Sequence, residues 1–510
     1  MPLESGRKHY VVMDDTRIAP VAVTASRSLQ FHEPRPSRLL MWLLGLVNRW
    51  CLLKGLPGLR RIPLVRDLPL VRGHFRIQTV EIPTADRVRL ARAVNPNTAA
   101  FIGPNHPEFG LDWMMDKEIS TFVAPHMASW AAHGIVRSAP RFWTKNNLVA
   151  NDGGAAATEY SVNWALKGRG VLLHPEGSVR WTSNRVHPLY HGIAEMATEA
   201  ARRAAASRTG RPVYIVPIVW KYHYSRDVSP RIHREIDLIE RELQLDRSNG
   251  SSVSERFRAL HENILNRQMK EFRFDPGSVA GLHFFVRQEA FRAHLVDELE
   301  SRYAIEPIGP LERRIGRLAR VIAAALKGLR GGEDAERKAT LVRDLAAVKE
   351  AGRLSGFSRD AYNTPVLTQE QVFECLKRIR ADLVGRGIRN TLHNFLPTPY
   401  GPRVAHIRVP DPILIDAERA SGGPSERKAY VVWLIEQAGA RMQSALDGIN
   451  RAIASEVDPF SHPNPFKDER SLAVLTARLR PTRAVIRPSR ETRTILISDL
   501  GETGLSRLSM

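Results

Sequence analysis

The stretch "WALKGRGVLLHPEGS" (residues 164–178) indicates how the middle of the chain folds. It reads as the end of a helix, a glycine stop, and a short buried strand that runs into a turn. The same order occurs earlier, where the helical pattern "TADRVRLARAVN" (84–95) leads into the apolar strand and turn "TAAFIGPNH" (98–106). Strands that alternate with helices in this way favour an α/β layer with parallel strands.

The pattern continues to residue 226. "GIAEMATEAARRAAAS" (192–207) predicts a long helix, and the β-branched run "RPVYIVPIVWKYHY" (211–224) predicts an interior strand. We therefore expect an α/β domain over residues 83–226, with a mainly parallel sheet and flanking helices. In such sheets the functional groups lie in loops just past the carboxyl ends of the strands. The polar clusters that begin at residues 105 and 174 both have this position.

The rest of the chain has a different character. Residues 1–37 predict an irregular segment, and residues 38–82 predict an apolar helix followed by a proline-marked connector. Residues 227–480 are rich in arginine and alanine with helical periodicity, so we expect a large, mainly helical C-terminal region. Within it, Thr368 and Gln371 have the spacing of a helix capping box. Residues 481–510 lack a clear apolar period and predict a loosely ordered tail.

The composition limits the kind of partner. The 75 Lys and Arg residues outnumber the 54 Asp and Glu residues, which gives a net charge of +21 and implies attraction to a phospholipid surface, a nucleic acid or a phosphorylated substrate. The two cysteines, Cys51 and Cys375, are far apart and form no CxxC, so the sequence supports neither a disulfide framework nor a thiolate metal site and favours a reducing compartment. The N-terminus "MPLESGRKHYVVMDD" lacks the apolar core of an export signal, so we expect the protein to stay inside the cell.

The segment "RLLMWLLGLVNRWCLLKGLPGL" (38–59) is a candidate membrane contact. Its run of nine apolar residues ends at Asn48 and is about half of the ~20 residues that a spanning helix needs. Trp42, Trp50 and the flanking cations instead favour a helix that lies in the interface of an anionic membrane, on its cytoplasmic face. A helix docked on its own protein fits the same pattern, because periodicity does not separate the two.

His106 is the first candidate for chemistry. It lies in a turn after an apolar strand, with Asn105 before it and Asp112 six residues later. A neutral imidazole can take a proton from a hydroxyl if a carboxylate holds its other ring N–H. The pairing requires Asp112 to lie on the first turn of the element that follows. Glu108 and Asp116 are alternative acids.

The second candidate is the turn "HPEGSVRW" (174–181), which follows the apolar "GVLL". A glycine at position 177 lets backbone N–H groups approach an anionic or carbonyl oxygen, and Arg180 can bind a phosphate with its forked guanidinium. Taken alone, "PEGS" fits an ordinary strand-to-helix turn. Together with the His106 turn it points to one site.

Four blocks occur in order: "NHPEFGLD" (105–112), "HPEGSVR" (174–180), "PLYHGIAEMA" (188–197) and "IVPIVW" (215–220). In order and spacing they resemble the glycerophospholipid acyltransferase family, which includes bacterial 1-acylglycerol-3-phosphate acyltransferases. The resemblance covers residues 95–225. It implies an acyltransferase-like layered fold and the transfer of an acyl group from acyl-CoA or acyl-carrier protein to a hydroxyl of a glycerol-phosphate or lysophospholipid-like acceptor. It implies no metal or redox cofactor and no nucleic-acid partner.

The resemblance also implies roles for individual residues. His106 would be the catalytic base and Asp112 its partner. Turn amides near Gly177 are candidates for stabilising the tetrahedral oxyanion, a role worth about 3 kcal/mol per donor. Val216, Pro217 and Ile218 would form the supporting strand. The residues predicted to bind the substrate are Asn105, Lys145, Glu176, Gly177, Ser178 and Arg180.

This sequence departs from the family pattern at three places. Five residues separate His106 from Asp112, where the family block has four. Val179 stands where the family has arginine, which is displaced to Arg180, and Ser178 replaces the family threonine. In the intermediate stretch "FWTKNNLVANDGGAA" (142–156) the expected arginine is missing, and Lys145 is the nearby cation.

Three other functions remain open from the sequence. The basic balance and arginine-rich helices permit a nucleic-acid-binding protein, although no zinc-finger, RNA-recognition or helix-turn-helix pattern is present. The altered spacing between His106 and Asp112 permits a catalytically inactive relative of the acyltransferases. A metal hydrolase using His106 and His174 is a further alternative, without the HExxH spacing typical of such sites.

Overall fold

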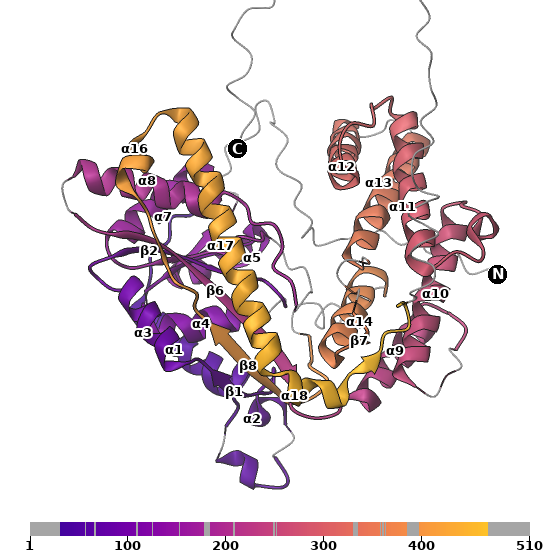
Figure 1. Ribbon diagram of the computed structural model, residues 1–510, viewed down its shortest axis with the longest axis horizontal. Helices are drawn as coiled ribbons and strands as arrows, with labels where there is room; N and C mark the ends of the chain where they lie inside the picture. The colour runs from indigo at the N-terminus through magenta and orange to yellow at the C-terminus, as the bar shows by residue number, and fades with distance from the viewer. Residues whose placement is uncertain are drawn as a thin grey trace, which may run out of the picture. The chain divides into compact units, whose positions relative to one another are not determined.

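The structure is a computed structural model, and its described residues form two compact units, many of whose elements are labelled in Figure 1. One unit, called the sheet unit, comprises residues 25–271 and 353–465, and the other, called the helical unit, is built around residues 272–352. The described residues are 31–56, 58–65, 68–108, 111–124, 126–151, 154–177, 184–207, 210–247, 250, 252–329, 335–357, 359, 362, 364–384 and 397–467. The predicted tail at 481–510 and most of the predicted irregular segment at 1–37 lie outside them.

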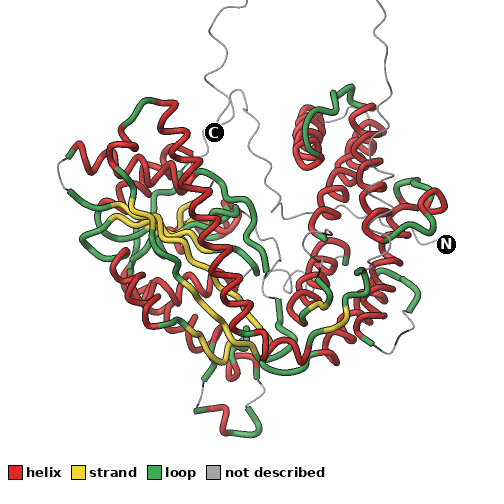
Figure 2. Tube along the Cα trace, viewed as in Figure 1, coloured by secondary structure: helices red, strands yellow, loops and turns green. Residues whose placement is uncertain are grey.

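The sheet unit is built on a mixed sheet, drawn in yellow in Figure 2. Its eight strands within the described residues are β1 (Ile77–Glu81), β2 (Ala99–Pro104), β3 (Ala128–Ala131), β4 (Leu148–Ala150), β5 (Val171–Leu172), β6 (Val213–Tyr224), β8 (Arg403–Arg408) and β9 (Ile413–Leu414). They follow the order β1-β8-β6-β2-β5-β3-β4, and β9 pairs with β6 beside this path. All neighbours are parallel except β8 and β9, which run antiparallel to β6. The prediction of an α/β fold with a mainly parallel sheet is confirmed.

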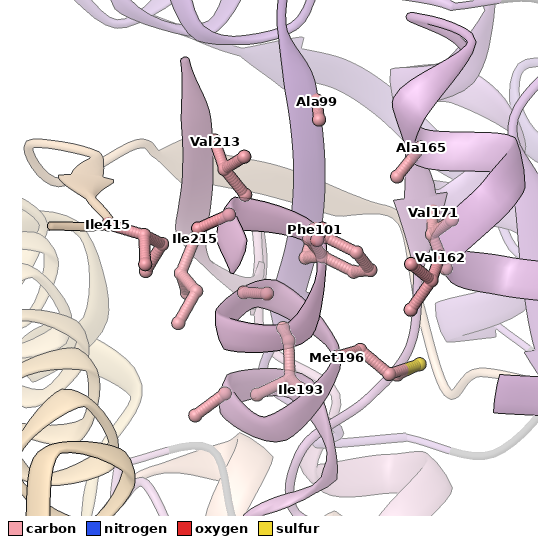
Figure 3. Close-up of a cluster of buried hydrophobic side chains, with 14 of the residues drawn as sticks. Ala99, Phe101, Val162, Ala165, Val171, Ile193, Met196, Val213, Ile215 and Ile415 are labelled. Carbon is pink, nitrogen blue, oxygen red and sulfur yellow. The ribbon is translucent and has the colours of Figure 1, made fainter. Parts of the chain in front are cut away.

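Helices cover both faces of this sheet. One face packs against α7 (Gly154–Leu166), α8 (Gly192–Ala206), α16 (Ala417–Ser421) and α17 (Pro424–Ala452), and Figure 3 shows part of this core around Phe101, Val171 and Ile215. The other face packs against α3 (Thr84–Ala93), α4 (Leu111–Val123) and the π-helix η1 (Asn48–Leu53). Since successive side chains of a strand point to opposite faces, Ile215 joins the first core and Ile218 the second.

Strand β6 changes partner halfway along its length. Residues 213–218 pair in parallel with β2, and residues 219–224 pair antiparallel with β8. The chain that leaves the carboxyl end of β2 therefore runs beside the second half of β6. This places the loop at residues 105–108 against Trp220 and Tyr222, which face the same side of the sheet.

The sheet extends beyond the predicted domain at 83–226 in both directions. β1 precedes that range, and β8 lies between β1 and β6 although it comes from residues 403–408. The predicted C-terminal region at 227–480 is otherwise mainly helical. In the sheet unit it contains α9 (Ser229–Glu242), α10 (Val253–Glu271), α14 (Gln369–Leu383), α18 (Ala454–Val457), η5 (Asp458–Phe460) and the small pair β7 (Val366–Leu367) and β10 (His462–Pro463). The capping box predicted at Thr368 and Gln371 is confirmed at the start of α14.

The N-terminal apolar segment forms α1 (Arg38–Val47), which continues into η1. It docks on α4, because the buried Asn48 side chain donates to the Met114 carbonyl (2.9 Å) and Arg49 pairs with Glu118 (3.2 Å). Its outer side carries exposed apolar side chains: Leu39, Trp42, Leu43, Leu46, Val47 and Trp50. None of the helices formed by the described residues is both long enough and apolar enough to cross a membrane.

The remaining elements are short or lie in the helical unit. The sheet unit also contains η2 (Leu59–Arg61), α2 (Pro69–Arg72), α5 (His133–Ser138) and α6 (Pro140–Lys145). The helical unit contains η3 (Pro276–Val279), α11 (Phe284–Arg302), α12 (Leu311–Gly328) and most of α13 (Ala335–Gly356). Arg314 of α12 pairs with Glu300 of α11, so an ion pair joins these two helices.

Candidate functional site

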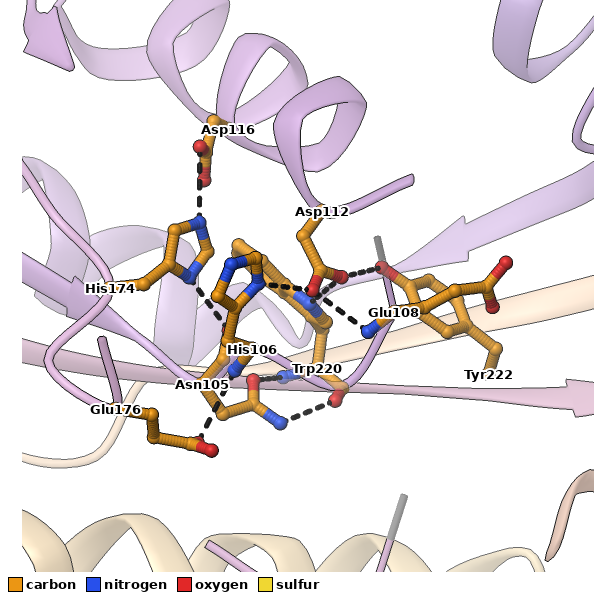
Figure 4. Close-up of polar contacts among 9 residues, drawn as sticks. All are labelled: Asn105, His106, Glu108, Asp112, Asp116, His174, Glu176, Trp220 and Tyr222. Carbon is orange, nitrogen blue, oxygen red and sulfur yellow. Dashed lines mark hydrogen bonds and ion pairs between the residues drawn. The ribbon is translucent and has the colours of Figure 1, made fainter. Parts of the chain in front are cut away.

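The two loops that the sequence singled out meet at one edge of the sheet. β2 and β5 are parallel neighbours, with Phe101 opposite Val171, so their carboxyl ends coincide. The backbone N–H of His106, after β2, donates to Glu176 Oε1, after β5, at 3.2 Å (Figure 4). The structure thus brings the two predicted motifs into one site.

His106 and Asp112 are in direct contact. His106 Nδ1 lies 2.7 Å from Asp112 Oδ2, and Asp112 is on the first turn of α4, as the pairing requires. The loop between them is held by the Glu108 backbone N–H, which also donates to Asp112 Oδ2 at 2.9 Å. A spacing of five residues between the two side chains is therefore compatible with a direct hydrogen bond.

Strand β6 supplies two more donors to Asp112. Its Oδ1 accepts from Trp220 Nε1 at 3.0 Å and from the Tyr222 hydroxyl at 3.1 Å (Figure 4). Burial raises the pKa of Asp112 to about 7, and it does so against the positive charge of His174 and the hydrogen bonds from Glu108 and Trp220. The carboxylate is completely shielded from solvent, and its position is fixed from both the loop and the sheet.

His106 is arranged as a neutral base. Burial, with the neighbouring His174, lowers the pKa of His106 well below its usual value. A neutral ring that faces a carboxylate through Nδ1 carries its proton there, which leaves a lone pair on Nε2. Among the described residues no hydrogen-bond partner faces Nε2, and 19% of the side chain is exposed. Nε2 can therefore accept a proton from a bound hydroxyl.

Three acids follow or neighbour the histidine, and each has its own partner. Asp112 holds His106, and Asp116 Oδ2 lies 3.2 Å from His174 Nε2. Glu108 forms a buried ion pair with Arg403 of β8, with 2.5 Å between Oε2 and Nη1. The alternatives to Asp112 as the partner of His106 are thus engaged elsewhere.

The turn after β5 is shaped by Glu176 and Gly177. Burial raises the pKa of Glu176 to about 7, and its carboxyl group accepts the His106 backbone N–H, so it joins the two loops. Gly177 has φ +75°, and a Cβ there would lie 2.5 Å from the Tyr190 ring, so glycine is required. Its N–H donates to the His174 carbonyl at 3.0 Å, which removes this amide from the donors expected to stabilise an oxyanion.

Two predicted substrate contacts have other surroundings. The Asn105 side chain is buried, and its amide exchanges hydrogen bonds with the Trp220 backbone N–H (2.9 Å) and carbonyl (3.0 Å). Asn105 therefore extends the pairing of β2 with β6 by one step and fixes the loop. Lys145 is exposed at the end of α6, and no hydrogen bond or ion pair among the described residues joins its side chain to the His106 loop. Ser178 and Arg180 lie outside the described residues.

Several residues that complete the site are not among those that the sequence predicts. Ile218, Trp220 and Tyr222 are every second residue of β6. All three therefore lie on the face of the sheet that α4 covers. His174 was considered only as a ligand in a metal hydrolase. Its ring stacks on that of His106 with 4.0 Å between centroids and 16° between planes. The feature of the sequence that could have indicated a role for His174 is its position immediately before the "PEG" turn.

The fold and site define an α/β protein with a buried histidine and carboxylate pair at the carboxyl edge of its sheet. Comparison of the chain with protein-family models finds no match, and comparison with curated proteins finds none either. The resemblance to the glycerophospholipid acyltransferases therefore depends on the four sequence blocks alone.

Proposed function

We propose that this protein is an acyltransferase that moves a fatty acyl group from a thioester, acyl-CoA or acyl-carrier protein, to a hydroxyl of a glycerol-phosphate or lysophospholipid-like acceptor. The observation that carries the proposal is the contact between His106 Nδ1 and Asp112, which leaves Nε2 without a hydrogen-bond partner among the described residues. The blocks that resemble the acyltransferase family supply the two loops of this site. The acyltransferase-like layered fold is part of the same proposal.

In the proposed reaction the acceptor hydroxyl donates its proton to His106 Nε2. Its oxygen forms a bond to the thioester carbonyl carbon, the carbon–sulfur bond breaks, and His106 returns the proton to the departing thiolate. Asp112 holds the Nδ1–H and stabilises the imidazolium that forms between these steps. Positioned proton transfer of this kind contributes roughly 10²- to 10⁴-fold in rate.

The outer face of α1 suggests how an insoluble acceptor reaches the site. Leu39 is 66% exposed and Trp42 is 60% exposed, and both belong to a helix that docks on α4, the helix that carries Asp112. Large apolar side chains exposed on one helix face are typical of proteins that lie on a membrane. We propose that α1 rests in the interface of an anionic membrane at its cytoplasmic face, beside the acceptor lipid.

The test measures thiol release from acyl-CoA in the presence of lysophospholipids with different headgroups, together with formation of the acylated lipid. We expect release to depend on the lysolipid and to fall about 10²- to 10⁴-fold in His106→Ala. His126→Ala is a matched control. His126 precedes β3, so it lies at the amino ends of the parallel strands, whereas His106 lies at their carboxyl ends. Equal release from the wild type and His106→Ala would contradict the proposal, and parallel assays with an acyl-carrier-protein donor identify the carrier.

A further inference from the structure

His174 has a hydrogen-bond acceptor at each ring nitrogen. Nδ1 lies 3.0 Å from the Asn105 carbonyl oxygen, and Nε2 lies 3.2 Å from Asp116 Oδ2 (Figure 4). A carbonyl oxygen only accepts, so Nδ1 must carry a proton, and a carboxylate requires the same of Nε2. An imidazole with protons on both nitrogens is an imidazolium cation.

This cation has a fixed orientation against the proposed base. The ring of His174 is stacked on that of His106 at 4.0 Å, and the Trp220 ring meets it nearly edge-on with 5.8 Å between centroids. Only 11% of the His174 side chain is exposed, so solvent screens its charge weakly. The four partners of the ring come from three separate parts of the sheet unit, which keeps its position constant.

We infer that His174 is a positioning residue that is charged at neutral pH and keeps the stacked His106 ring neutral, so that Nε2 of His106 is free to accept a proton. The role of His106 in this inference depends on the proposed function, whereas the charge state of His174 does not. His174 itself cannot exchange protons with a substrate in this arrangement, because both of its ring nitrogens are engaged.

The charges of His174 and Asp116 act on the pair in opposite directions, because His174 lowers the pKa of His106 and Asp112 whereas Asp116 raises them. Burial alone would lower the pKa of His174, but the Asp116 carboxylate raises this pKa to about 9. The charge of His174 opposes protonation of His106 and favours ionisation of Asp112, so it lowers the pKa of both partners in the pair. The other ionisable groups that face the pair are Glu108 with its partner Arg403, Glu176, and Tyr222. Removal of the His174 charge therefore raises the pH at which the pair gains a proton, whichever member receives it.

The charge of His174 is tested by nitrogen-15 NMR of the full-length protein labelled at histidine. The signals of His174 are assigned as those that disappear in His174→Phe, which retains an aromatic ring to stack on His106. We expect both His174 nitrogens to be protonated at pH 7 and to titrate near pH 9. An unprotonated Nδ1 or Nε2 at pH 7 would overturn the inference.

The effect on the base is tested by the pH dependence of kcat/KM for acyl transfer. His174→Phe removes the charge, and Asp116→Asn removes the counter-charge but keeps an oxygen that can accept from Nε2. In His174→Phe we expect the acidic limb of the profile to move to higher pH by about 1 to 3 units, the range typical for a charge at this distance. In Asp116→Asn we expect a smaller shift, because the Asp116 carboxylate itself raises the pKa of His106 and Asp112, and its loss partly offsets the loss of charge on His174. Asp411→Asn, at an exposed aspartate, serves as the control for loss of a carboxylate.

Two results separate this inference from its alternatives. A loss of rate that is equal at every pH would show that His174 only supports the structure, and would overturn the inference. If no acyl transfer is found under any condition, the proposed function fails, and the titration of His106 followed by NMR replaces the rate profile. An unchanged His106 titration in His174→Phe and Asp116→Asn would then overturn the inference on its own.

Discussion

At the scale of single residues, the site is organised around the Asp112 carboxylate. Each of its oxygens has two donors: Trp220 and Tyr222 at Oδ1, and His106 and the Glu108 backbone at Oδ2. Four donors orient the carboxylate so that Oδ2 faces the His106 ring. The imidazolium that forms during proton transfer is then stabilised without movement of the protein, which is the main way that a fixed carboxylate assists a histidine.

Asp112 leads to a prediction on pH dependence. Burial raises the pKa of Asp112 to about 7, above the usual value for aspartate, so the anion forms only as the pH rises through this value. We therefore expect kcat/KM for acyl transfer to increase between about pH 6 and 8 and then to level off. Asp112→Asn should lower kcat by about 10⁴-fold and abolish the increase near pH 7, because a neutral amide does not stabilise the imidazolium and offers only one oxygen to the four donors. A full increase near pH 7 in Asp112→Asn would assign the ionisation to another group.

The sequence could indicate the residues that begin a polar cluster but not those that complete it. His106 and Glu176 could be predicted because each follows a short apolar strand, and parallel strands bring their carboxyl ends together. Trp220 and Tyr222 lie inside a strand, where a large side chain normally means core packing. Only the partner change of β6 after Ile218 brings them beside the His106 loop, and the pairing of strands distant in sequence has no local signal.

At the scale of elements, α1 has two faces with different tasks. Its inner face ends at the buried Asn48, which binds the carbonyl of Met114, and its outer face carries Leu39, Trp42 and Leu43. The sequence left a docking helix and an interfacial helix open as alternatives. One docked face and one exposed apolar face satisfy the geometry of both, because a helix of ten residues, nearly three turns, can use opposite sides.

The exposed face of α1 leads to a prediction on membrane binding. Leu39→Ser with Trp42→Ser should weaken binding to vesicles that contain anionic phospholipids by roughly 10²- to 10⁴-fold. Each large apolar side chain contributes about 1.5–3 kcal/mol when buried, so two contribute about 3–6 kcal/mol, and about 1.4 kcal/mol is a factor of ten. The measurement is cosedimentation with vesicles of anionic and of zwitterionic composition. Leu414→Ser is the control, because Leu414 is 56% exposed on β9, away from α1. Equal binding of the double variant and this control would exclude α1 as the contact.

At the scale of the whole molecule, the sheet is assembled from both ends of the chain. β8 lies in the interior of the sheet, parallel to β1 and antiparallel to β6, although some 180 residues separate it from β6 along the chain. Arg403 of β8 is buried and pairs with Glu108, so the C-terminal part also holds the loop between His106 and Asp112. The sequence predicted a domain ending near residue 226 because the helix-strand alternation stops there. The stretch "GPRVAHIRVPDPILID" (401–416) reads as one or two strands, but a short β-branched run does not show which sheet it joins, and both β8 and β9 return to β6 after a long helical region.

This arrangement predicts that a fragment of residues 38–226 does not fold by itself. Without β8 and α17, one edge of β6 and both cores lose buried side chains such as Ile407, Leu434 and Ile435. With Val409, Tyr430 and Val431 these make six side chains at about 1.5–3 kcal/mol each, a loss of about 9–18 kcal/mol that is as large as the ~5–15 kcal/mol that stabilises a typical domain. Glu108 would also remain buried without Arg403, and an unpaired buried charge costs about 3–5 kcal/mol.

Circular dichroism and denaturant titration of the fragment should show no cooperative unfolding, whereas full-length Arg403→Met should still unfold cooperatively but at a lower denaturant concentration. A fragment that unfolds cooperatively and keeps a neutral His106 by NMR would restore the boundary at residue 226 and make the C-terminal strand a later addition to an already complete site.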